Sequence, residues 1–424
     1  MKKSPPRTKR GLASASACLG MLATGGLTAH AQTTDTTTIS DLEKQNQAMQ
    51  QRLDTLEDLV KKEGLVPSAP ATNLVSALDK MTISGFVQAS YFYNLDRPAN
   101  GLSDGYLWNT RDNSFSINKV KITLASPPVE PSGDNWNAGY RVSLMAGEDA
   151  PIVNTDAGTI GFDYLREAYV ELNVPIGTGL DIKAGELISL LNYESGDGGA
   201  ANENFSQGYQ WYYTGNPPAA GVQLGYTFTP WLSAQFRVDN GLYSGPLATA
   251  TRKGVMGSLN FTIDSKTWFH VIGFGGEGAG TLSADGGSVI GGRQLTDKLG
   301  SGFEFDYFHF DPDSSASGDT WSIGGWLWYD FTPKIGLAFR GEFLDDVNGM
   351  GLNTRLGAPA PFGAGIFSPD ANGNLASFTL TLNLKPTPNI KIQPEFRYDT
   401  TSYTGGFNGG HNQFIVGCGA SYLF

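Results

Sequence analysis

Charged residues recur in this chain at positions that alternate with apolar residues. Segment 390–399, IKIQPEFRYD, places Ile390, Ile392 and Phe396 on one side of a two-residue period. The other side carries Lys391 and Arg397. This period is typical of a β-strand with one apolar and one polar face. Charges gathered on one face of a sheet can order water and interact with polar solutes, so they are candidates for lining an aqueous path.

The candidate lining residues carry both signs and occupy the polar side of such segments. They are Lys119, Lys121, Arg141, Glu171, Asp181, Lys183, Arg237, Asp239, Glu304, Asp306, Arg340, Glu342, Lys391, Glu395, Arg397 and Asp399. Opposed rows of charge would create a transverse field that favours polar solutes. The alternative is that they form cross-strand ion pairs that stabilise the wall, each worth ~0.2–1 kcal/mol.

The elements that carry these charges are predicted strands joined in a regular way. Short turn phrases such as YTFTPWLS at 226–233 and DFTPKIG at 330–336 alternate with long Gly-rich segments, including 95–113, 147–162 and 276–286. Short turns at one end and long loops at the other are typical of an outer-membrane barrel. Eight such hairpins over residues 81–424 predict an antiparallel β-barrel of about 16 strands, within a range of 14–18. The weakest predicted strand is 287–295.

The composition agrees with an all-β protein. The 424 residues include 55 Gly, 24 Phe, 17 Tyr and 8 Trp, whereas charged residues make up only 17%. Aromatic richness argues against disorder, and the body of the chain has none of the long apolar runs of a helical membrane bundle. The first predicted strand, TISGFVQASYFY, departs from strict alternation at Phe86 and Phe92.

The N-terminus predicts export. Five basic residues within the first ten are followed by a small-residue and apolar stretch and by Ala29-His30-Ala31, so residues 1–31 resemble a signal peptide. A lipoprotein signal at Cys18 is the alternative. Cleavage after Ala31 leaves 24 Lys and Arg against 41 Asp and Glu, a net charge of −17. That charge argues against a nucleic-acid partner and predicts a mild cation preference.

A helical segment is expected ahead of the barrel. Seven residues within 39–60 follow spacings of three and four, which predicts a short coiled coil with Asn46 at an a position. We assign residues 32–64 to a periplasmic coiled-coil helix and residues 65–80 to a linker. The alternative is an amphipathic helix packed on its own domain. The coiled-coil residues are Ile39, Leu42, Asn46, Met49, Leu53, Leu56 and Val60.

A long loop folded inward would narrow such a barrel, and segment 191–217 is the candidate. Its acidic residues would favour cations, and its aromatic residues would give sugars a stacking surface. The alternatives are an ordinary surface loop, or constriction by segment 346–374 with Asp345, Asp346 and Arg355. The constriction candidates are Glu194, Asp197, Glu203, Tyr209, Trp211 and Tyr212.

The chain ends in Phe424, after a run in which Phe414, Val416, Cys418 and Tyr422 alternate with small or polar residues. A terminal Phe after such a run resembles the C-terminal signature by which bacterial outer-membrane barrels are recognised for assembly. Outer-membrane lipid and the barrel-assembly machinery are therefore expected partners. In this register Cys418 would face lipid as a small apolar side chain.

Residues 81–424 resemble the OmpL-like β-barrel porins of Gram-negative bacteria. The phrases that carry the resemblance are REAYVELNVP (166–175), LDIKAGEL (180–187), NYESG (192–196), NENFSQGYQWYYTGNPPAAGVQLGY (202–226), LAFRGEFLDDVNG (337–349) and IQPEFRYDT (392–400). The resemblance implies a passive channel in the outer membrane. Since barrels of 16–18 strands leave an aqueous lumen, we expect diffusion of small hydrophilic solutes or ions through a homotrimer. The alternatives are a sugar-selective porin and a structural tether that uses the coiled coil.

Enzymatic motifs find no support in the sequence. G-x-G-x-x-G occurs at Gly273, Gly275 and Gly278, but the following residues do not predict the helix that a dinucleotide site needs. We therefore expect no catalytic residues, no cofactor and no metal.

Overall fold

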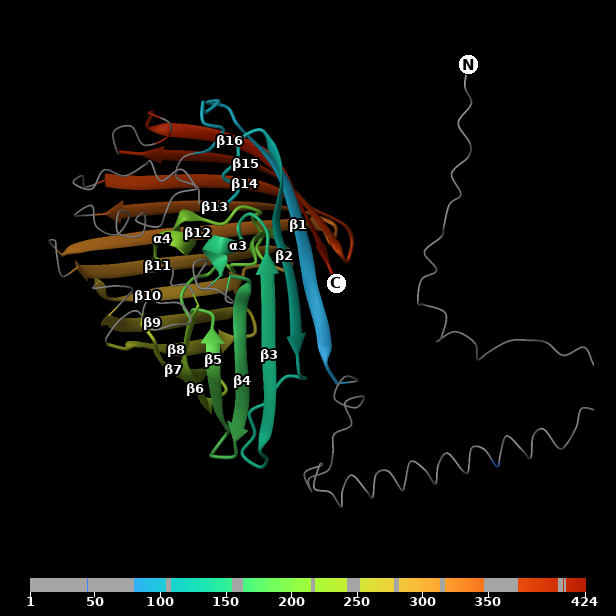
Figure 1. Cartoon of the computed structure of the whole chain (residues 1–424), viewed down its shortest axis with the longest axis vertical. Helices are drawn as coiled ribbons and strands as arrows, with labels where there is room; N and C mark the ends of the chain where they lie inside the picture. Colours follow the sequence, from blue (N-terminus) through green and yellow to red (C-terminus); the bar gives the residue numbers. More distant parts are fainter. Residues whose placement is uncertain are drawn as a thin grey trace, which may run out of the picture. The chain divides into compact units, whose positions relative to one another are not determined.

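The computed structural model forms one closed barrel of antiparallel strands (Figure 1). It describes residues 44, 80–103, 108–154, 163–214, 218–241, 252–277, 282–312, 317–346, 373–402, 407 and 409–424. Within these residues sixteen strands follow one another in chain order, and the first pairs with the last, Phe86 opposite Leu423. The predicted strand number is confirmed.

The strands alternate in direction around the wall. They are β1 (Thr82–Asn94), β2 (Ser114–Ala125), β3 (Asn137–Ala146), β4 (Leu165–Val174), β5 (Leu180–Leu187), β6 (Ala219–Thr229), β7 (Leu232–Asp239), β8 (Gly254–Asp264), β9 (Thr267–Glu277), β10 (Leu282–Gln294), β11 (Leu299–Pro312), β12 (Gly318–Thr332), β13 (Ile335–Asp346), β14 (Gly373–Thr387), β15 (Ile390–Thr401) and β16 (Asn412–Leu423). Short helical turns in the described part of the barrel accompany them: α3 (Ala150–Val153), η1 (Gly198–Ala200) and α4 (Tyr209–Tyr213).

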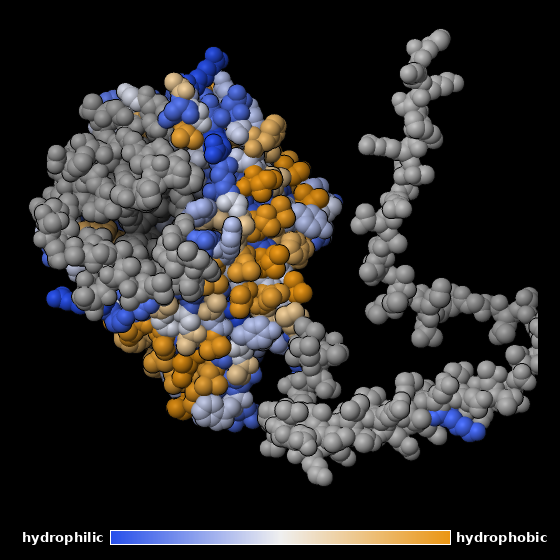
Figure 2. All heavy atoms as spheres, viewed as in Figure 1, coloured by the Kyte–Doolittle hydropathy of each residue, from blue (hydrophilic) through white to orange (hydrophobic). Residues whose placement is uncertain are grey.

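The strands place apolar side chains outside and most polar side chains inside, although β8 to β11 also bury apolar side chains such as Met256, Phe274 and Phe308 on the inner face. On β13, for example, Phe339 is 41% exposed on the outer face, whereas Arg340 and Glu342 are buried. The face drawn in Figure 2 accordingly carries a broad hydrophobic area over the strands. Exposed rings such as Phe331 and Tyr422 lie near the end of the barrel that holds the start of β1 and the C-terminus, as the aromatic girdle of a membrane barrel does.

The two ends of the barrel differ in their connections. At the end near Thr82 and Phe424, most neighbouring strands are joined by two to five residues, as between Thr229 and Leu232. Connections at the opposite end are generally longer. The predicted long loop at 276–286 is wrong, because β10 already pairs with β9 from Ser283 and Glu277 onward. Glycines made this stretch resemble a loop, but Gly276 lies within β9 and Gly286 within β10.

The described residues contain no helix of the length and apolar character needed to cross a membrane. The predicted signal peptide and linker lie outside the described residues, as does the predicted coiled coil apart from Lys44, which is helical.

A charge on the outer wall tests the membrane orientation of the barrel. Leu327 is 45% exposed on the middle part of β12, and Phe331 is 50% exposed near the end of that strand. We expect Leu327→Arg to lower the free energy of unfolding in lipid vesicles by ~2–4 kcal/mol, and Phe331→Arg by ~0–1 kcal/mol. Urea unfolding in vesicles measures both. Equal losses of unfolding free energy in the two variants would contradict the placement of Leu327 deeper in the membrane than Phe331.

Candidate functional site: the polar lumen and its inward segment

The connection between β5 and β6 enters the barrel. We call residues 188–214 the inward segment. It contains η1, which contacts β1, β15 and β16, and α4, which is drawn among the strands in Figure 1. Leu187 and Ala219, the residues at which the connection leaves and rejoins the wall, are paired across β5 and β6. The intervening chain is therefore an excursion from one point of the wall, and its polar groups must find partners inside the barrel.

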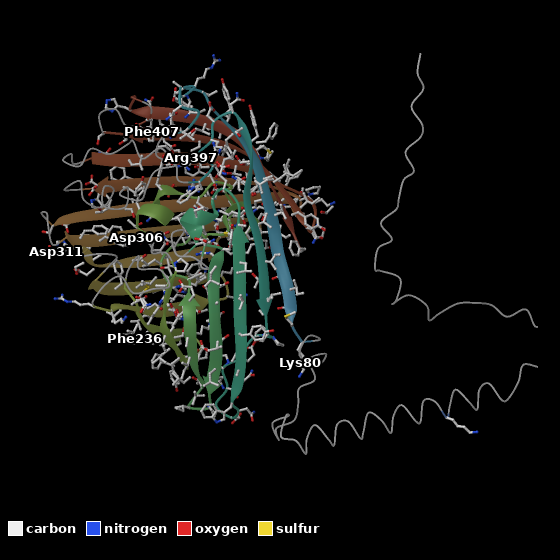
Figure 3. All side chains as sticks on the ribbon, viewed as in Figure 1. Lys80, Phe236, Asp306, Asp311, Arg397 and Phe407 are labelled. Atoms are coloured by element: carbon white, nitrogen blue, oxygen red, sulfur yellow. The ribbon has the colours of Figure 1, made fainter. Side chains whose placement is uncertain are left out.

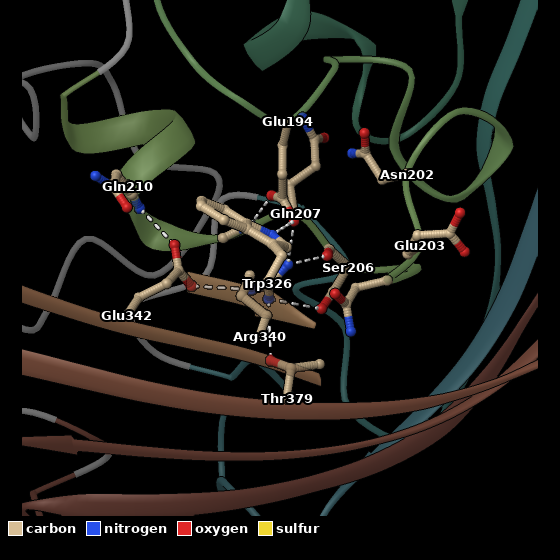
Figure 4. A network of polar contacts seen from close by, with 12 residues as sticks. Glu194, Asn202, Glu203, Ser206, Gln207, Gln210, Trp326, Arg340, Glu342 and Thr379 are labelled. Carbon is tan, nitrogen blue, oxygen red and sulfur yellow. Dashed lines mark hydrogen bonds and ion pairs between the residues drawn. The ribbon is translucent and has the colours of Figure 1, made fainter. Parts of the chain in front are cut away.

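The strongest attachment of the inward segment is to a buried arginine. Arg340 on β13 donates from Nη1 to Glu194 Oε1 at 2.8 Å and to the Ser206 carbonyl oxygen at 2.6 Å. Trp326 Nε1 donates to the same Glu194 oxygen at 3.0 Å, as Figure 4 shows. Neither Arg340 nor the Glu194 side chain is more than 3% exposed. Removing one member would leave an uncompensated buried charge.

Carboxylates on the same wall bind backbone N–H groups of the segment. Glu342 accepts from the Gln210 N–H at 2.9 Å (Figure 4), and Glu395 accepts from the Phe205 N–H at 2.8 Å. Within the segment, the Gly208 N–H donates to Glu194 at 2.7 Å. Charge-assisted bonds of this kind are roughly twice as strong as neutral ones.

The opposite side of the segment contacts basic residues of β2. Lys119 Nζ donates to Gln207 Oε1 at 2.7 Å, and Lys121 Nζ forms an ion pair with Asp197 at 2.8 Å. Gln88 Nε2 on β1 donates to the Asp197 carbonyl oxygen at 2.9 Å. The segment therefore bridges β13 and β15 on one side and β1 and β2 on the other.

Two acidic residues of β11 hold the ends of the segment. Glu304 accepts from the Tyr193 N–H at 2.8 Å, and Asp306 accepts from Gln210 Nε2 at 2.8 Å and Thr214 Oγ1 at 2.7 Å. Asp306 points into the barrel, as does Arg397, whereas Phe236 points away from it (Figure 3).

Aromatic side chains fill the space between the segment and the wall. Phe92 stacks on Phe205 at a centroid distance of 5.9 Å, and Trp108 meets Trp211 edge-on at 5.2 Å. Arg397 lies over the Tyr209 ring at 4.4 Å. These contacts explain why Phe92 departs from the alternation of β1, since its inward side faces a packed segment rather than water.

Comparison with known proteins places this barrel in a family. The family described as "Putative beta-barrel porin-2, OmpL-like" matches residues 80–424. The chain belongs to this porin family. It is accordingly an outer-membrane β-barrel porin, and the predicted resemblance is confirmed. No curated protein matches the chain.

Solved structures share the porin fold at low sequence identity. The anion-selective porin from Comamonas acidovorans is 11% identical, with 81% of this chain and 99% of that chain covered and a TM-score of 0.54. Pseudomonas putida OprB is 13% identical, with 82% and 96% covered and a TM-score of 0.54. OmpT of Vibrio cholerae, in its trimer form, is 10% identical, with 81% and 99% covered and a TM-score of 0.52. At these identities the likeness concerns the fold.

The charged residues proposed for the lining of the porin lie on the inner face of the wall. Arg141, Glu171, Asp181 and Lys183 are partly exposed there. The others are buried: Lys119, Lys121, Arg237, Asp239, Glu304, Asp306, Arg340, Glu342, Lys391, Glu395, Arg397 and Asp399. Buried residues of this group contact the inward segment, so much of the lining supports protein rather than open water.

The ion pairs of these charged residues run both along single strands and between neighbouring strands. Arg237–Asp239, Arg340–Glu342 and Arg397–Asp399 are ion pairs between residues two apart on one strand, at 3.0, 3.0 and 2.8 Å. Cross-strand pairs join Arg141 to Glu167 at 2.6 Å and Lys183 to Glu171 at 3.1 Å. Acid and base are thus interleaved on β7, β13 and β15, because residues two apart share one face of a strand. By contrast, β2 carries the basic residues Lys119 and Lys121, and β11 carries the acidic residues Glu304 and Asp306.

The six constriction candidates lie on the inward segment. Glu194 and Tyr209 are buried, and Asp197, Glu203 and Trp211 are partly exposed. The side chain of Tyr212 lies outside the described part of the chain. The ordinary surface loop does not agree with these contacts. Of the competing segment 346–374, Arg355 is not described, and Asp346 is buried at the end of β13, where it accepts from Thr320 Oγ1 at 3.0 Å.

Several polar residues of the site lack a recognisable sequence signal. Gln207, Gln210 and Ser206 bind the wall through backbone and amide groups, and uncharged residues of this kind occur in any loop. Phe86 and Phe92 are the residues from which inward packing could have been predicted, because they are large apolar side chains on an otherwise polar face. A water-filled lumen would leave them exposed, so their position indicates packing inside the barrel.

Burial changes the acidity of two groups outside the strands. It raises the pKa of Asp149 to about 6, an effect that nearby Lys119 opposes. Asp149 accepts from the Asn109 N–H at 3.0 Å. Burial also raises the pKa of Tyr193, and neighbouring Glu203 and Glu194 add to the effect, so the phenol is neutral at physiological pH. Among the described residues, no group of three or more His, Cys, Asp or Glu is arranged to hold a metal ion.

The Arg340–Glu194 pair provides a test of the segment's attachment. We expect Arg340→Met to lower the free energy of unfolding by ~3–5 kcal/mol, because it leaves the Glu194 carboxylate buried without its cation. The double variant Arg340→Met with Glu194→Gln should recover part of that loss. Lys266→Met, whose side chain is 54% exposed and pairs with an Asp297 side chain that is 99% exposed, is the matched control with a cost of ~0–1 kcal/mol. Denaturant titration in detergent measures all four proteins, and equal costs at residues 340 and 266 would refute the attachment.

Proposed function

We propose that the porin lets small hydrophilic solutes and ions diffuse passively through a lumen narrowed by the inward segment. The observation that carries this proposal is the set of charged contacts between the segment and the wall, above all Glu194 with Arg340. Because the segment is fixed to the wall on both sides, it reduces the cross-section of the lumen permanently and does not open and close as a lid does. Its polar surface favours solutes that exchange hydrogen bonds with it.

Cations are the preferred ions in this proposal. Among the described residues, eleven buried side chains are Asp or Glu and seven are Lys or Arg. The acidic excess is local at β11, where Glu304 and Asp306 form no ion pair among the described residues. Charges in a confined lumen of low dielectric act strongly on passing ions.

Ion selectivity in planar bilayers tests the proposal. Discrete conductance steps and a reversal potential that favours K⁺ over Cl⁻ are the expected results for the unmodified porin. Glu304→Gln combined with Asp306→Asn should reduce the permeability ratio towards one. Asp297→Asn, at a turn side chain 99% exposed, should leave the ratio unchanged and is the matched control.

Two outcomes would count against this account. Absence of conductance steps at high protein load would overturn passive diffusion. A reversal potential that favours Cl⁻ would overturn the cation preference and direct attention to Lys119, Lys121 and Arg166.

We further propose that residues 1–31 are removed as a signal peptide and that residues 32–64 form a periplasmic coiled coil in a homotrimer. The heptad spacing of residues 39–60 supports this role. A structural tether is the second candidate function of that segment. Three heptads are marginal alone, so contacts between barrels would share in holding the trimer.

Deletion of residues 32–64 separates these roles. We expect the deleted protein, exported behind residues 1–31, to conduct as before and to form trimers that dissociate at a lower temperature. Heat-dependent gel mobility and bilayer recordings measure the two properties. Unchanged trimer melting would refute the coiled-coil role, and unchanged envelope integrity in cells would refute the tether.

A further inference from the structure

One row of the inner wall pairs two tryptophans across two glycines. Trp268 on β9 lies opposite Gly292 on β10, Gly292 lies opposite Gly302 on β11, and Gly302 lies opposite Trp326 on β12. Even-numbered residues of these strands face inward, as the burial of Ile290 and Glu304 shows. Because neither glycine has a side chain, the wall between the two indole rings is bare backbone at Gly292 and Gly302, and we call this part of the wall the floor.

The rings at this floor lie close to the wall. A Cβ at residue 292 would come within 2.9 Å of Trp268 Nε1, and a Cβ at residue 302 would collide with the ring of Tyr193 from the inward segment. The Tyr193 and Trp268 rings are parallel to within 4° at a centroid distance of 6.2 Å. Tyr193 also contacts Trp326 at 4.5 Å. Glycine is thus required here by close approach rather than by backbone conformation.

The aromatic surface extends along β12. A Cβ at residue 300 would collide with the indole of Trp328, so this ring also lies over a glycine. Trp268, Tyr193 and Trp328 are partly exposed. We call Tyr193, Trp268, Trp326 and Trp328 the aromatic platform. Apart from Tyr193, it stands on strand residues, which hold a binding surface more rigidly than loops do.

Hydrogen-bonding groups border the platform. His270 follows Trp268 on the same face of β9, with ring centroids 4.8 Å apart, and Asn260 on β8 lies opposite His270. Asn260 Oδ1 is buried and has no hydrogen-bond partner within the described part of the barrel. His270 is partly exposed. An acceptor and an imidazole beside flat rings suit a ligand with one apolar face and hydroxyl groups at its edge.

We propose that the aromatic platform is a binding subsite for neutral pyranose sugars on their way through the lumen. The C–H bonds on one face of a pyranose carry partial positive charge, which the negative face of an aromatic ring attracts. The sugar hydroxyls then bond His270 and Asn260 at the edge. Tyr193 adds a neutral phenol, and the Glu304 carboxylate already accepts from the Tyr193 N–H and Asn192 Nδ2.

This inference deepens the proposed function, because it names a solute class for the same lumen. It also accounts for the position of the platform. Trp326 donates to Glu194, the residue through which Arg340 holds the inward segment, so the platform adjoins the narrowed part of the lumen. A weak stacking site beside a constriction concentrates its solute there and still releases it.

Binding of maltotriose to the folded, detergent-solubilised porin tests the platform directly. Isothermal titration calorimetry should show saturable binding of maltotriose and none of sorbitol, an acyclic polyol without a flat ring face. Trp268→Ala and Trp328→Ala should each raise the Kd about tenfold, equivalent to ~1.4 kcal/mol. Trp268→Phe, which keeps a ring, should restore much of the affinity.

The matched control is Trp321→Ala on the outer face of β12, where Trp321 contacts Phe343 at a centroid distance of 5.4 Å. Its Kd should equal that of the unmodified porin. No saturable binding of maltotriose, equal binding of sorbitol, or an equal loss in Trp321→Ala would each overturn the inference. The conductance steps of the same preparation report separately on passive diffusion. Steps without sugar binding therefore reject only the platform, and sugar binding without steps rejects only the channel.

Discussion

Buried carboxylates on the inner wall hold the inward segment by accepting hydrogen bonds from its backbone N–H groups. Glu342 and Glu395 each accept from two consecutive residues of the segment, and Glu194 accepts from Gly208 while it contacts Arg340. A chain that enters a barrel brings unpaired backbone groups into a site with little water. Glu342 and Glu395 each remove that cost at two donors and Glu194 at one, and Arg340 in turn compensates the charges of Glu194 and Glu342.

This arrangement reconciles two demands on the strands. Lipid outside requires apolar side chains, and a wall closed through β1 and β16 satisfies every strand edge. The inside must accommodate both polar solutes and a folded segment. Interleaved pairs such as Arg397–Asp399 keep neighbouring charges compensated along one strand. Partly exposed residues such as Arg141 on β3 and Lys183 on β5 lie apart from the buried pairs under the segment, such as Arg340–Glu342.

Much of the barrel follows from periodicity. The two-residue alternation separates Phe339 from Arg340 without knowledge of their neighbours, since one face must meet lipid and the other the lumen. Turn spacing likewise predicts the strand number. Glycine-rich strands were harder to recognise: residues 276–286 resembled a loop because Gly286 and Gly287 carry no side chain that marks a face, although they pair with β11 in the wall.

The contacts inside the barrel were much less predictable. Acidic and aromatic residues made 191–217 a candidate for inward folding, but the wall partners of Glu194 lie more than 130 residues away on β12 and β13. Such contacts depend on the register of distant strands. The Trp268–Gly292–Gly302–Trp326 row has the same origin, because four strands must align before the two glycines become a floor.

The central claim is that the inward segment sets the width of the lumen, and the pairing of Leu187 with Ala219 makes a direct measurement possible. A four-residue Gly-Ser turn that replaces residues 188–218 would close this hairpin at its existing register. Single-channel conductance in the presence of polyethylene glycols of increasing size then reports the width. We expect the shortened porin to conduct several-fold more and to admit larger polymers, as an open 16-stranded barrel does. Unchanged conductance and an unchanged polymer cut-off would contradict the account.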